Sequence, residues 1–285
     1  MAERQAEIEA RLASIQELQG IVSAMRSLAA LRMQQAQATI EGIRSFSAMV
    51  ARALGQALEL MPPDLPTGGN HDAMARRGII LFCAEHGFVG GFNERVLAAL
   101  APASSQPLDL IVVGSRGMLA CEERKLSVSW SATMPTQTGG IVATANRIAD
   151  ELYRRFRAGS LSRVEMIFAR HIGGGRSKVE RRPLLPVALE PFRSAPTVNP
   201  PLTNLPVRLL VERLVGEHLF AELAHAVTES FTSENGARLE TMRMAKRNID
   251  ERLAHLHQTE RQLRQEEITS ELLELTTGAA GGVQF

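Results

Sequence analysis

The stretch RGIILFCAEHGFVGGFNERV, residues 77–96, contains an apolar run, a turn with three glycines and the beginning of a helix. A strand, a glycine-rich turn and a helix in this order are typical of phosphate-binding folds. However, Gly87, Gly90 and Gly91 do not follow the G-x-G-x-x-G order of dinucleotide-binding proteins, and no acidic residue stands at the end of a second strand. We therefore expect these glycines to let the chain turn tightly rather than to bind a phosphate.

Around this stretch, residues 77–192 alternate between strand-like and helical runs. The strand-like runs are RGIILFCA, LDLIVVGS, KLSVSWSAT and RVEMIFARH, with helical segments beginning at Asn93, near Arg116 and at IVATANRIADELYRRFR. This alternation predicts a mostly parallel sheet covered on both faces. The last strand-like run continues through IGGGRSK into VERRPLLPV, which predicts a hairpin.

Both ends of the chain have the pattern of long helices. From residue 3 to about residue 59 there is no proline, and apolar residues recur in steps of three and four from Ile8 to Leu54 with Gln19 as an interruption. A continuous helix over this segment would be roughly 85 Å long. The pattern returns after Val207, and the steps from Met242 to Leu263 are seven residues each, the period of a coiled-coil seam. This second helix would reach on the order of 105 Å.

The expected fold is therefore α/β: a long antiparallel coiled coil of the N- and C-terminal helices plus a central Rossmann-like, mostly parallel-sheet domain. The proline- and glycine-rich segments MPPDLPTGGNHD and PFRSAPTVNPPLTNLP separate the parts. The expected boundaries are 1–60 for the N-terminal coiled-coil helix, 61–76 for a linker, 77–192 for the α/β domain, 193–206 for a second linker and 207–285 for the C-terminal coiled-coil helix and its tip.

Composition and charge exclude several functions. The chain has 32 Lys and Arg against 31 Asp and Glu, a net charge of +1 that does not favour a nucleic-acid or anionic-lipid partner. No apolar run is long enough for direct membrane insertion, and the N-terminus lacks the pattern of a signal peptide. His255 and His257 cannot share one helical face as metal ligands. We expect no metal site, no cofactor and no catalytic residue.

The C-terminal helix has two kinds of surface. Seven basic and seven acidic residues are interspersed between Glu234 and Glu267, which indicates a solvated, salt-bridged face. By contrast, ITSELLELTTGAAGGVQF and the facing GIVSAMRSLAAL consist mostly of small or apolar residues. An exposed apolar tip of this kind is expected to be enclosed by a partner.

Three segments at the two ends of the chain have a familiar pattern: AEIEARLASIQELQGIVSAMRSLAALRMQQAQ, SENGARLETMRMAKRNIDERL and RQEEITSELLELTTGAA. They resemble, in this order, the N-terminal helix, the C-terminal helix and the terminal signature of the gamma subunit of F-type ATP synthases. In the middle, Gly90, Gly91, Phe92 and Asn93 match the family's Gly-Gly-Phe-Asn and imply a turn of its foot domain.

Two departures indicate a divergent branch of the family. Gly20, Val22 and Ser23 stand where the family has a lysine-containing segment, and Glu85 to Val89 replace its usual Asp-Arg-Gly-Leu-Cys. The alternate, sodium-associated ATPases are one candidate for this branch.

The resemblance implies a central-stalk subunit, or rotor shaft, that couples hydrogen-ion or sodium-ion flow through a membrane c ring to ATP synthesis or hydrolysis. The implied partners are the alpha and beta subunits of the catalytic ring, the epsilon subunit and the c-subunit ring, on the cytoplasmic side of a bacterial plasma membrane. The implied contacts with the ring are made by Ile21, Ala24, Met25, Arg26, Ala29, Arg238, Arg264, Ile268, Thr269, Glu271, Leu272 and Gly278. Two alternatives stay open: a nucleotide-dependent Rossmann-type enzyme and a freestanding coiled-coil scaffold.

Overall fold

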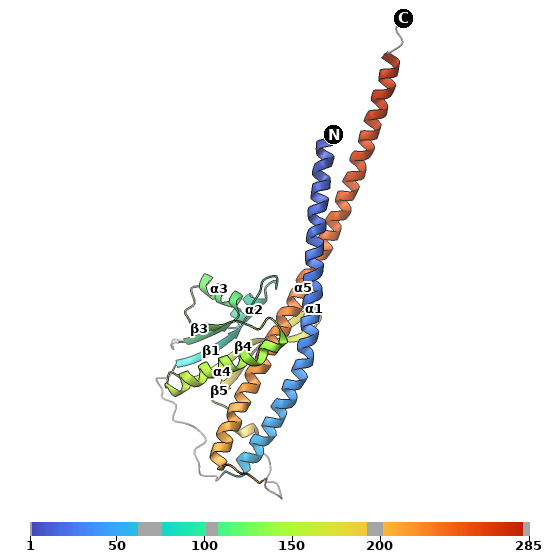
Figure 1. Cartoon of the computed structure of the whole chain (residues 1–285). Helices are drawn as coiled ribbons and strands as arrows, with labels where there is room; N and C mark the ends of the chain where they lie inside the picture. The colour runs from blue at the N-terminus through green and yellow to red at the C-terminus, as the bar shows by residue number, and fades with distance from the viewer. Residues whose placement is uncertain (1, 62–75, 101–107, 193–201, 282–285) are drawn as a thin grey trace. The chain divides into compact units, whose positions relative to one another are not determined.

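The computed structural model describes residues 2–61, 76–100, 108–192 and 202–281. The elements are α1 (Ala2–Glu59), β1 (Arg76–Phe82), α2 (Phe92–Ala98), β2 (Leu108–Val113), α3 (Ser115–Glu123), β3 (Val128–Ala132), η1 (Thr138–Gly140), α4 (Ile141–Arg157), β4 (Leu161–Gly173), β5 (Arg176–Leu185), η2 (Glu190–Phe192) and α5 (Val207–Gly281) (Figure 1). Most of the two expected linkers, 61–76 and 193–206, lies outside the described residues.

The chain divides into two compact units whose boundaries fall inside both long helices. One unit is Met1–Leu28 with Leu239–Phe285, and the other is Ala29–Arg238. The second unit therefore includes the sheet together with the greater part of α1 and the first part of α5. The five-part division expected from the sequence, with boundaries at the linkers, stays a prediction.

A five-stranded sheet forms the centre of the larger unit, in the order β3-β2-β1-β4-β5. Strands β1 to β4 are parallel to their neighbours, while β4 and β5 form an antiparallel hairpin. At the hairpin turn, Gly173, Gly174 and Gly175 all have positive φ angles, which glycine adopts without steric cost. The expected α/β fold with a mostly parallel sheet is confirmed.

The sheet is covered on both faces, as parallel sheets require. Helices α4 and α5 cover one face, where Phe82, Ile111 and Phe168 meet Ile148 and Leu223. Helices α2 and α3 cover the other face, where Leu81, Val112 and Ile167 meet Phe92 and Cys121. Figure 1 shows α4 on one side of the strands and α2 with α3 on the other.

Within the larger unit, α1 and α5 run antiparallel. Leu54, Ala57 and Leu58 near the end of α1 pack with Val211 near the beginning of α5. Further along, Phe46 packs edge-to-face with Phe220 at 6.3 Å between the ring centroids.

In the smaller unit, the ends of α1 and α5 form an antiparallel helix pair. Leu12 and Leu253 are buried in its seam, and Gln19 Nε2 donates a hydrogen bond of 2.6 Å to Asp250 Oδ1. The polar interruption at Gln19 therefore has a partner on the facing helix. None of the helices in the described part of the chain has a stretch long and apolar enough to cross a bilayer.

Candidate functional site: the polar seam of α5

The middle of α5 contains a run of buried polar side chains, which we call the polar seam. Its members are each at most 6% exposed: Thr228, Glu229, Ser230, Thr232, Ser233, Glu234, Asn235 and Arg238. Burying polar groups is costly unless they form hydrogen bonds. Thr228, Thr232 and Asn235 donate hydrogen bonds of 2.7 to 2.8 Å to carbonyls one turn earlier in α5. Glu229, Ser233, Glu234 and Arg238 bind neighbouring elements, whereas the buried hydroxyl of Ser230 has no hydrogen-bond partner among the described residues.

Glu234 and Arg238 form a buried ion pair that binds the loop after β1. The carboxylate of Glu234 lies 2.6 Å from Arg238 Nη2. The same carboxylate accepts the backbone N–H groups of Glu85 and His86 at 3.1 and 3.3 Å. Arg238 in turn donates to the carbonyls of His86 and Gly87, both at 3.2 Å. The loop thus presents its donors to the anion and its acceptors to the cation.

Glu85 extends this network across the carboxyl edge of the sheet. Its carboxylate accepts the N–H and the hydroxyl of Ser115, at 3.1 and 2.6 Å, and the N–H of Met134 at 2.8 Å. Ser115 begins α3 directly after β2, and Met134 follows β3. A carboxylate at a helix N-terminus is electrostatically favourable. One side chain therefore joins the ends of β1, β2 and β3.

Glu229 and Ser233 bind α5 to β4. Glu229 is 2% exposed and accepts the N–H of His171 at 3.2 Å, while the Ser233 hydroxyl donates to the carbonyl of Ala169 at 2.9 Å. Arg44 of α1 approaches the Glu229 carboxylate at 3.5 Å. Nε2 of His225 lies 3.6 Å from the same carboxylate. This part of the seam joins α5, β4 and α1.

Burial favours the neutral form of the two histidines near Glu229. Burial lowers the pKa of His171 and of His225 below the usual value, and the nearby Glu229 carboxylate opposes this effect only in part. His225 also packs edge-to-face on Phe168 at 6.1 Å between the ring centroids.

The expected foot-domain turn forms a tight bend between β1 and α2. Gly90 has a φ of +55°, Gly91 directly precedes α2, and Phe92 is buried in the core. The Asn93 side-chain oxygen accepts the N–H of Ala84 at 2.9 Å, which ties α2 back to the end of β1. These contacts support the interpretation that the turn has a structural role.

The loop after β1 does not present a free phosphate cradle. In dinucleotide-binding folds, ligands bind outside the carboxyl ends of the strands where the strand order reverses, which here is between β1 and β4. At this place the N–H groups of Glu85 and His86 already bind the Glu234 carboxylate. A nearby cavity of about 640 Å³ is lined by Glu85 and Arg147 among other residues, so a ligand there would meet both a carboxylate and a guanidinium. Among the described residues, no group of three or more His, Cys, Asp or Glu is placed to hold a metal ion.

The predicted contact residues on α1 differ in exposure. Ile21 is 57% exposed and Ala24 is exposed as well, whereas Met25 and Arg26 are half-buried. Ala29 is 1% exposed and packs inside the protein. Ile21 and Ala24 therefore offer surface to a partner, and Ala29 contributes to internal packing.

Most of the predicted contact residues on the last part of α5 are exposed. Ile268 and Leu272 are 52% and 57% exposed, and Thr269 and Glu271 are exposed beside them. Arg264 is also exposed and approaches Glu260 at 3.6 Å. Gly278 belongs to the last turns of α5, beyond the residues whose burial is described.

The contact residues on the two helices lie at different levels of the helix pair. Gln19 is opposite Asp250, which places Ile21 near that level. Ile268 is 18 residues further along α5 than Asp250, about 27 Å at 1.5 Å per residue. The two predicted sets are therefore separate surfaces of the smaller unit.

Arg238, one of the expected contacts with the ring, is buried in the described structure. Its side chain is 8% exposed and paired with Glu234, so its charge is directed into the protein. The salt-bridged face expected between Glu234 and Glu267 begins beyond it, with exposed or half-exposed pairs such as Glu240–Arg243 and Lys246–Asp250.

The sequence analysis missed Glu85, Glu229, Ser233 and Glu234 as a connected site. One signal was present: between Phe231 and Leu239 the apolar stripe of the C-terminal helix is interrupted by a run of small and polar residues. A long helix with polar residues in its stripe needs partners for them wherever that segment is buried.

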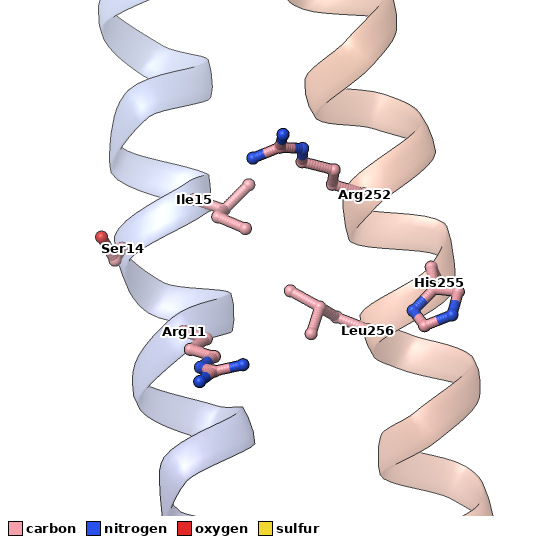
Figure 2. Close-up of a pocket in the computed structure, with 6 residues that line it drawn as sticks. All are labelled: Arg11, Ser14, Ile15, Arg252, His255 and Leu256. Carbon is pink, nitrogen blue, oxygen red and sulfur yellow. The ribbon is translucent and has the colours of Figure 1, made fainter.

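A groove of about 370 Å³ lies between the two helices of the smaller unit. Figure 2 shows Ile15 and Leu256 facing each other across it, with Arg11 and Arg252 pointing inward from opposite helices. Ser14 and His255 complete its lining. The two helices are therefore not closely packed at this level, and the groove between them is lined by apolar side chains from both helices and by one arginine from each helix.

Comparisons with known proteins agree with this architecture. The protein-family model ATP-synt, described as ATP synthase, matches residues 4–281. The ATP synthase gamma chain of Moorella thermoacetica is 24% identical over 276 residues, covering 96% of this chain and 97% of the relative. The ATP synthase gamma chain of Rhodospirillum rubrum is 26% identical over 296 residues, with coverage of 96% and 97%.

Solved structures share the fold. A chain of the Euglena gracilis mitochondrial ATP synthase rotor in rotational state 1 matches with a TM-score of 0.62 and 13% identity, over 94% of this chain and 100% of that chain. A chain from the OSCP/F1/c-ring structure of the same synthase in rotational state 3 gives a TM-score of 0.63 and 14% identity, over 100% and 98%. Since the family model and the curated relatives both span nearly the whole chain, the protein belongs to the ATP synthase family, as one of its gamma chains.

Proposed function

We propose that this chain is the central-stalk subunit of an F-type ATP synthase. Its helix pair would turn inside a ring of alpha and beta subunits, and its sheet domain would bind the epsilon subunit and a c-subunit ring. Ion flow through the c ring would rotate the chain, and the rotation would drive the nucleotide sites of the ring through states of different affinity.

The observation that supports this proposal best is the exposed apolar surface on very long helices. Helix α1 has 58 residues and α5 has 75. At the far part of α5, Ile268, Leu272 and Leu273 are 52%, 57% and 60% exposed. Clustered apolar side chains on a surface indicate an interaction site. A shaft enclosed by a ring of other subunits would cover them.

In this proposal the chain contributes no catalytic group of its own. Glu85, Glu234 and Arg238 at the carboxyl edge of the sheet bind each other's segments and the backbone, so they act as structural groups. The nucleotide would be bound and hydrolysed by the alpha and beta subunits. This proposal favours neither a Rossmann-type enzyme nor a freestanding scaffold, and assignment to a sodium-associated branch stays a prediction.

The site residues follow from the exposure of the side chains. Ile21 and Ala24 on α1, with Ile268, Thr269 and Leu272 on α5, are exposed, uncharged members of the predicted set and would contact the ring. Met25 and Arg26 are half-buried and would contact the ring through the exposed part of their side chains. Arg264, Glu271 and Gly278 would belong to the same contact surface on α5. The complex would stand at the bacterial plasma membrane, with this chain peripheral on the cytoplasmic side.

Copurification tests the proposal. The chain is coexpressed with the alpha and beta subunits encoded in its own organism, with an affinity tag on alpha. We expect the chain to copurify, and the double variant Ile268→Asp and Leu272→Asp to copurify poorly, because each carboxylate would have to lose water inside an apolar sleeve.

A matched control uses an exposed leucine in the sheet domain. Leu119 on α3 is 48% exposed, and Leu119→Asp is expected to leave copurification with alpha and beta unchanged. Absence of the wild-type chain from the tagged complex, combined with micromolar nucleotide binding by the isolated chain in calorimetry, would support the enzyme alternative instead.

A further inference from the structure

The polar seam binds α5 to the sheet through directional contacts at two places. We infer that Glu234 and Arg238 are positioning residues that keep α5 from rotating or sliding against the sheet while torque passes between them. The inference rests on the proposed function, because torque is a property of a rotor. It assigns to this ion pair a role in coupling rather than in binding any partner.

The geometry of the seam opposes rotation of α5. Glu229 and Ser233 bind the end of β4, whereas Glu234 and Arg238 bind the loop after β1. Five residues of an α-helix turn through about 500°, so Glu229 and Glu234 point about 140° apart around the helix axis. A rotation of α5 in either direction would break hydrogen bonds of both groups.

Apolar packing alone would resist such movement poorly. The hydrophobic effect is non-directional and depends on the area buried, and much of the α5 surface here consists of small residues such as Ala224, Ala226 and Ala237. Hydrogen bonds, by contrast, weaken steeply when their angle changes. Because Glu234 and Arg238 are 3% and 6% exposed, their separation would leave two charges without water or a partner.

The loop bound by this pair is itself held across the sheet. The backbone of Glu85 donates to Glu234, and the side chain of Glu85 binds Ser115 and Met134 after β2 and β3. A force on α5 at Glu234 is therefore passed to the ends of three parallel strands rather than to one flexible loop.

The test uses the whole synthase in inverted membrane vesicles, with this chain carrying Arg238→Ala, Arg238→Lys or Glu234→Gln. ATP hydrolysis is measured together with the ATP-driven membrane potential, which a voltage-sensitive dye reports whatever the transported ion. We expect Arg238→Ala to retain hydrolysis but to lose most of the potential formed per ATP hydrolysed. Arg238→Lys is expected to recover part of the potential, because lysine keeps the positive charge. The recovery should be incomplete, because lysine lacks the planar fork of donors of the guanidinium group.

A buried ion pair elsewhere in the same domain supplies the control. Arg155 of α4 lies 2.6 Å from Asp109 of β2 and is 8% exposed, and its hydrogen bonds join α4 to β2 and β3. Arg155→Ala should lower the thermal midpoint of the isolated chain as Arg238→Ala does, yet leave the ratio of potential to hydrolysis at the wild-type value.

The possible outcomes separate this inference from the proposed function. If Arg238→Ala and Glu234→Gln keep the wild-type ratio, or if Arg155→Ala lowers it equally, the positioning role is wrong while the central-stalk function stands. If both conservative variants, Arg238→Lys and Glu234→Gln, fail to assemble, the pair is part of the folding core and the inference is also wrong. If the wild-type chain itself does not assemble with alpha and beta, the proposed function fails.

Discussion

Glu234 occupies the place where many α/β proteins bind an anionic ligand. Its carboxylate accepts two consecutive backbone N–H groups at the carboxyl edge of the sheet, where the strand order reverses. Backbone donors at this position favour negative charge. A side chain of α5 supplies that charge here, so the same geometry that binds a phosphate elsewhere fixes a helix to the sheet.

The Glu234–Arg238 pair predicts a strong effect on stability. Arg238→Met leaves Glu234 as a buried charge without its cation, and we expect a loss of about 3 kcal/mol in the free energy of unfolding. The double variant Glu234→Gln with Arg238→Met removes both charges. Its loss in the free energy of unfolding should be smaller than the sum of the losses of the two single variants. Urea denaturation of the isolated chain measures all three. Strictly additive effects would contradict a direct interaction.

The close approach of α3 to β1 gives a second residue-level prediction. A Cβ atom on Gly117 would lie 2.2 Å from the Cβ of buried Cys83, so Gly117→Ala should destabilise the chain by about 1 to 3 kcal/mol through overpacking. Gly42 in α1 has no atom within 4 Å of an added Cβ, and Gly42→Ala should stabilise by about 0.5 to 1 kcal/mol. Equal changes in the thermal midpoint for Gly117→Ala and Gly42→Ala would contradict this packing argument.

Helix α5 combines two environments in one element. From Ala221 to Leu239 nearly every side chain is buried, whereas from Arg243 onward exposed residues alternate with a narrow seam. A helix that is buried on all sides is typical of a protein core, whereas a helix with one apolar stripe is typical of a protein surface or a coiled coil. The sequence periodicity predicted the stripe but not the buried segment, because burial on the other sides depends on where the sheet and α1 are placed.

The histidines at the α5–β4 contact predict a pH dependence. Burial lowers the pKa of His171 and His225 in the folded chain, whereas in the unfolded chain their pKa is about 6.5. As the pH falls from 7 to about 5.5, the unfolded chain takes up protons that the folded chain does not, so stability that is present at pH 7 is lost.

The measurement for this prediction is the thermal midpoint at several pH values. We expect it to fall between pH 7 and about 5.5 for the wild-type chain, and to fall less for His225→Gln. A substitution of exposed His257, whose ring approaches Glu260 at 3.2 Å, serves as the control. A wild-type midpoint that is constant over this range would contradict the effect of burial on these two pKa values.

At the scale of the whole molecule, the order of elements could be predicted from the sequence. Alternating strand-like and helical runs predicted the parallel sheet, the glycine-rich IGGGRSK predicted the hairpin turn, and the regular recurrence of apolar residues predicted both long helices. These patterns depend only on residues that are near one another in the sequence, so they can be recognised without knowledge of the tertiary structure. The pairing of Gln19 with Asp250, and of Glu234 with the loop after β1, joins residues far apart in the sequence and could not be read from periodicity.

The end of α5 predicts the behaviour of a truncated chain. Deleting residues from Ile268 onward removes the exposed Ile268, Leu272 and Leu273 but leaves the sheet domain and the polar seam intact. We expect the truncated chain to fold with an unchanged thermal midpoint and to weaken assembly or torque of the complex. A truncated chain that assembles and couples normally would show that this surface does not contact the ring.

Rotation of the sheet domain inside an immobilised catalytic ring tests the central claim most directly. Cys83 and Cys121 are both 0% exposed, so a maleimide-linked probe will select a cysteine introduced at exposed Arg124, at the end of α3. The chain with Arg124→Cys is assembled with alpha and beta subunits fixed to a surface, and the probe is observed after ATP is added. We predict stepwise rotation in one direction that stops when ATP is removed. An assembled complex that hydrolyses ATP while the probe stays still would contradict the assignment of this chain as the rotor shaft.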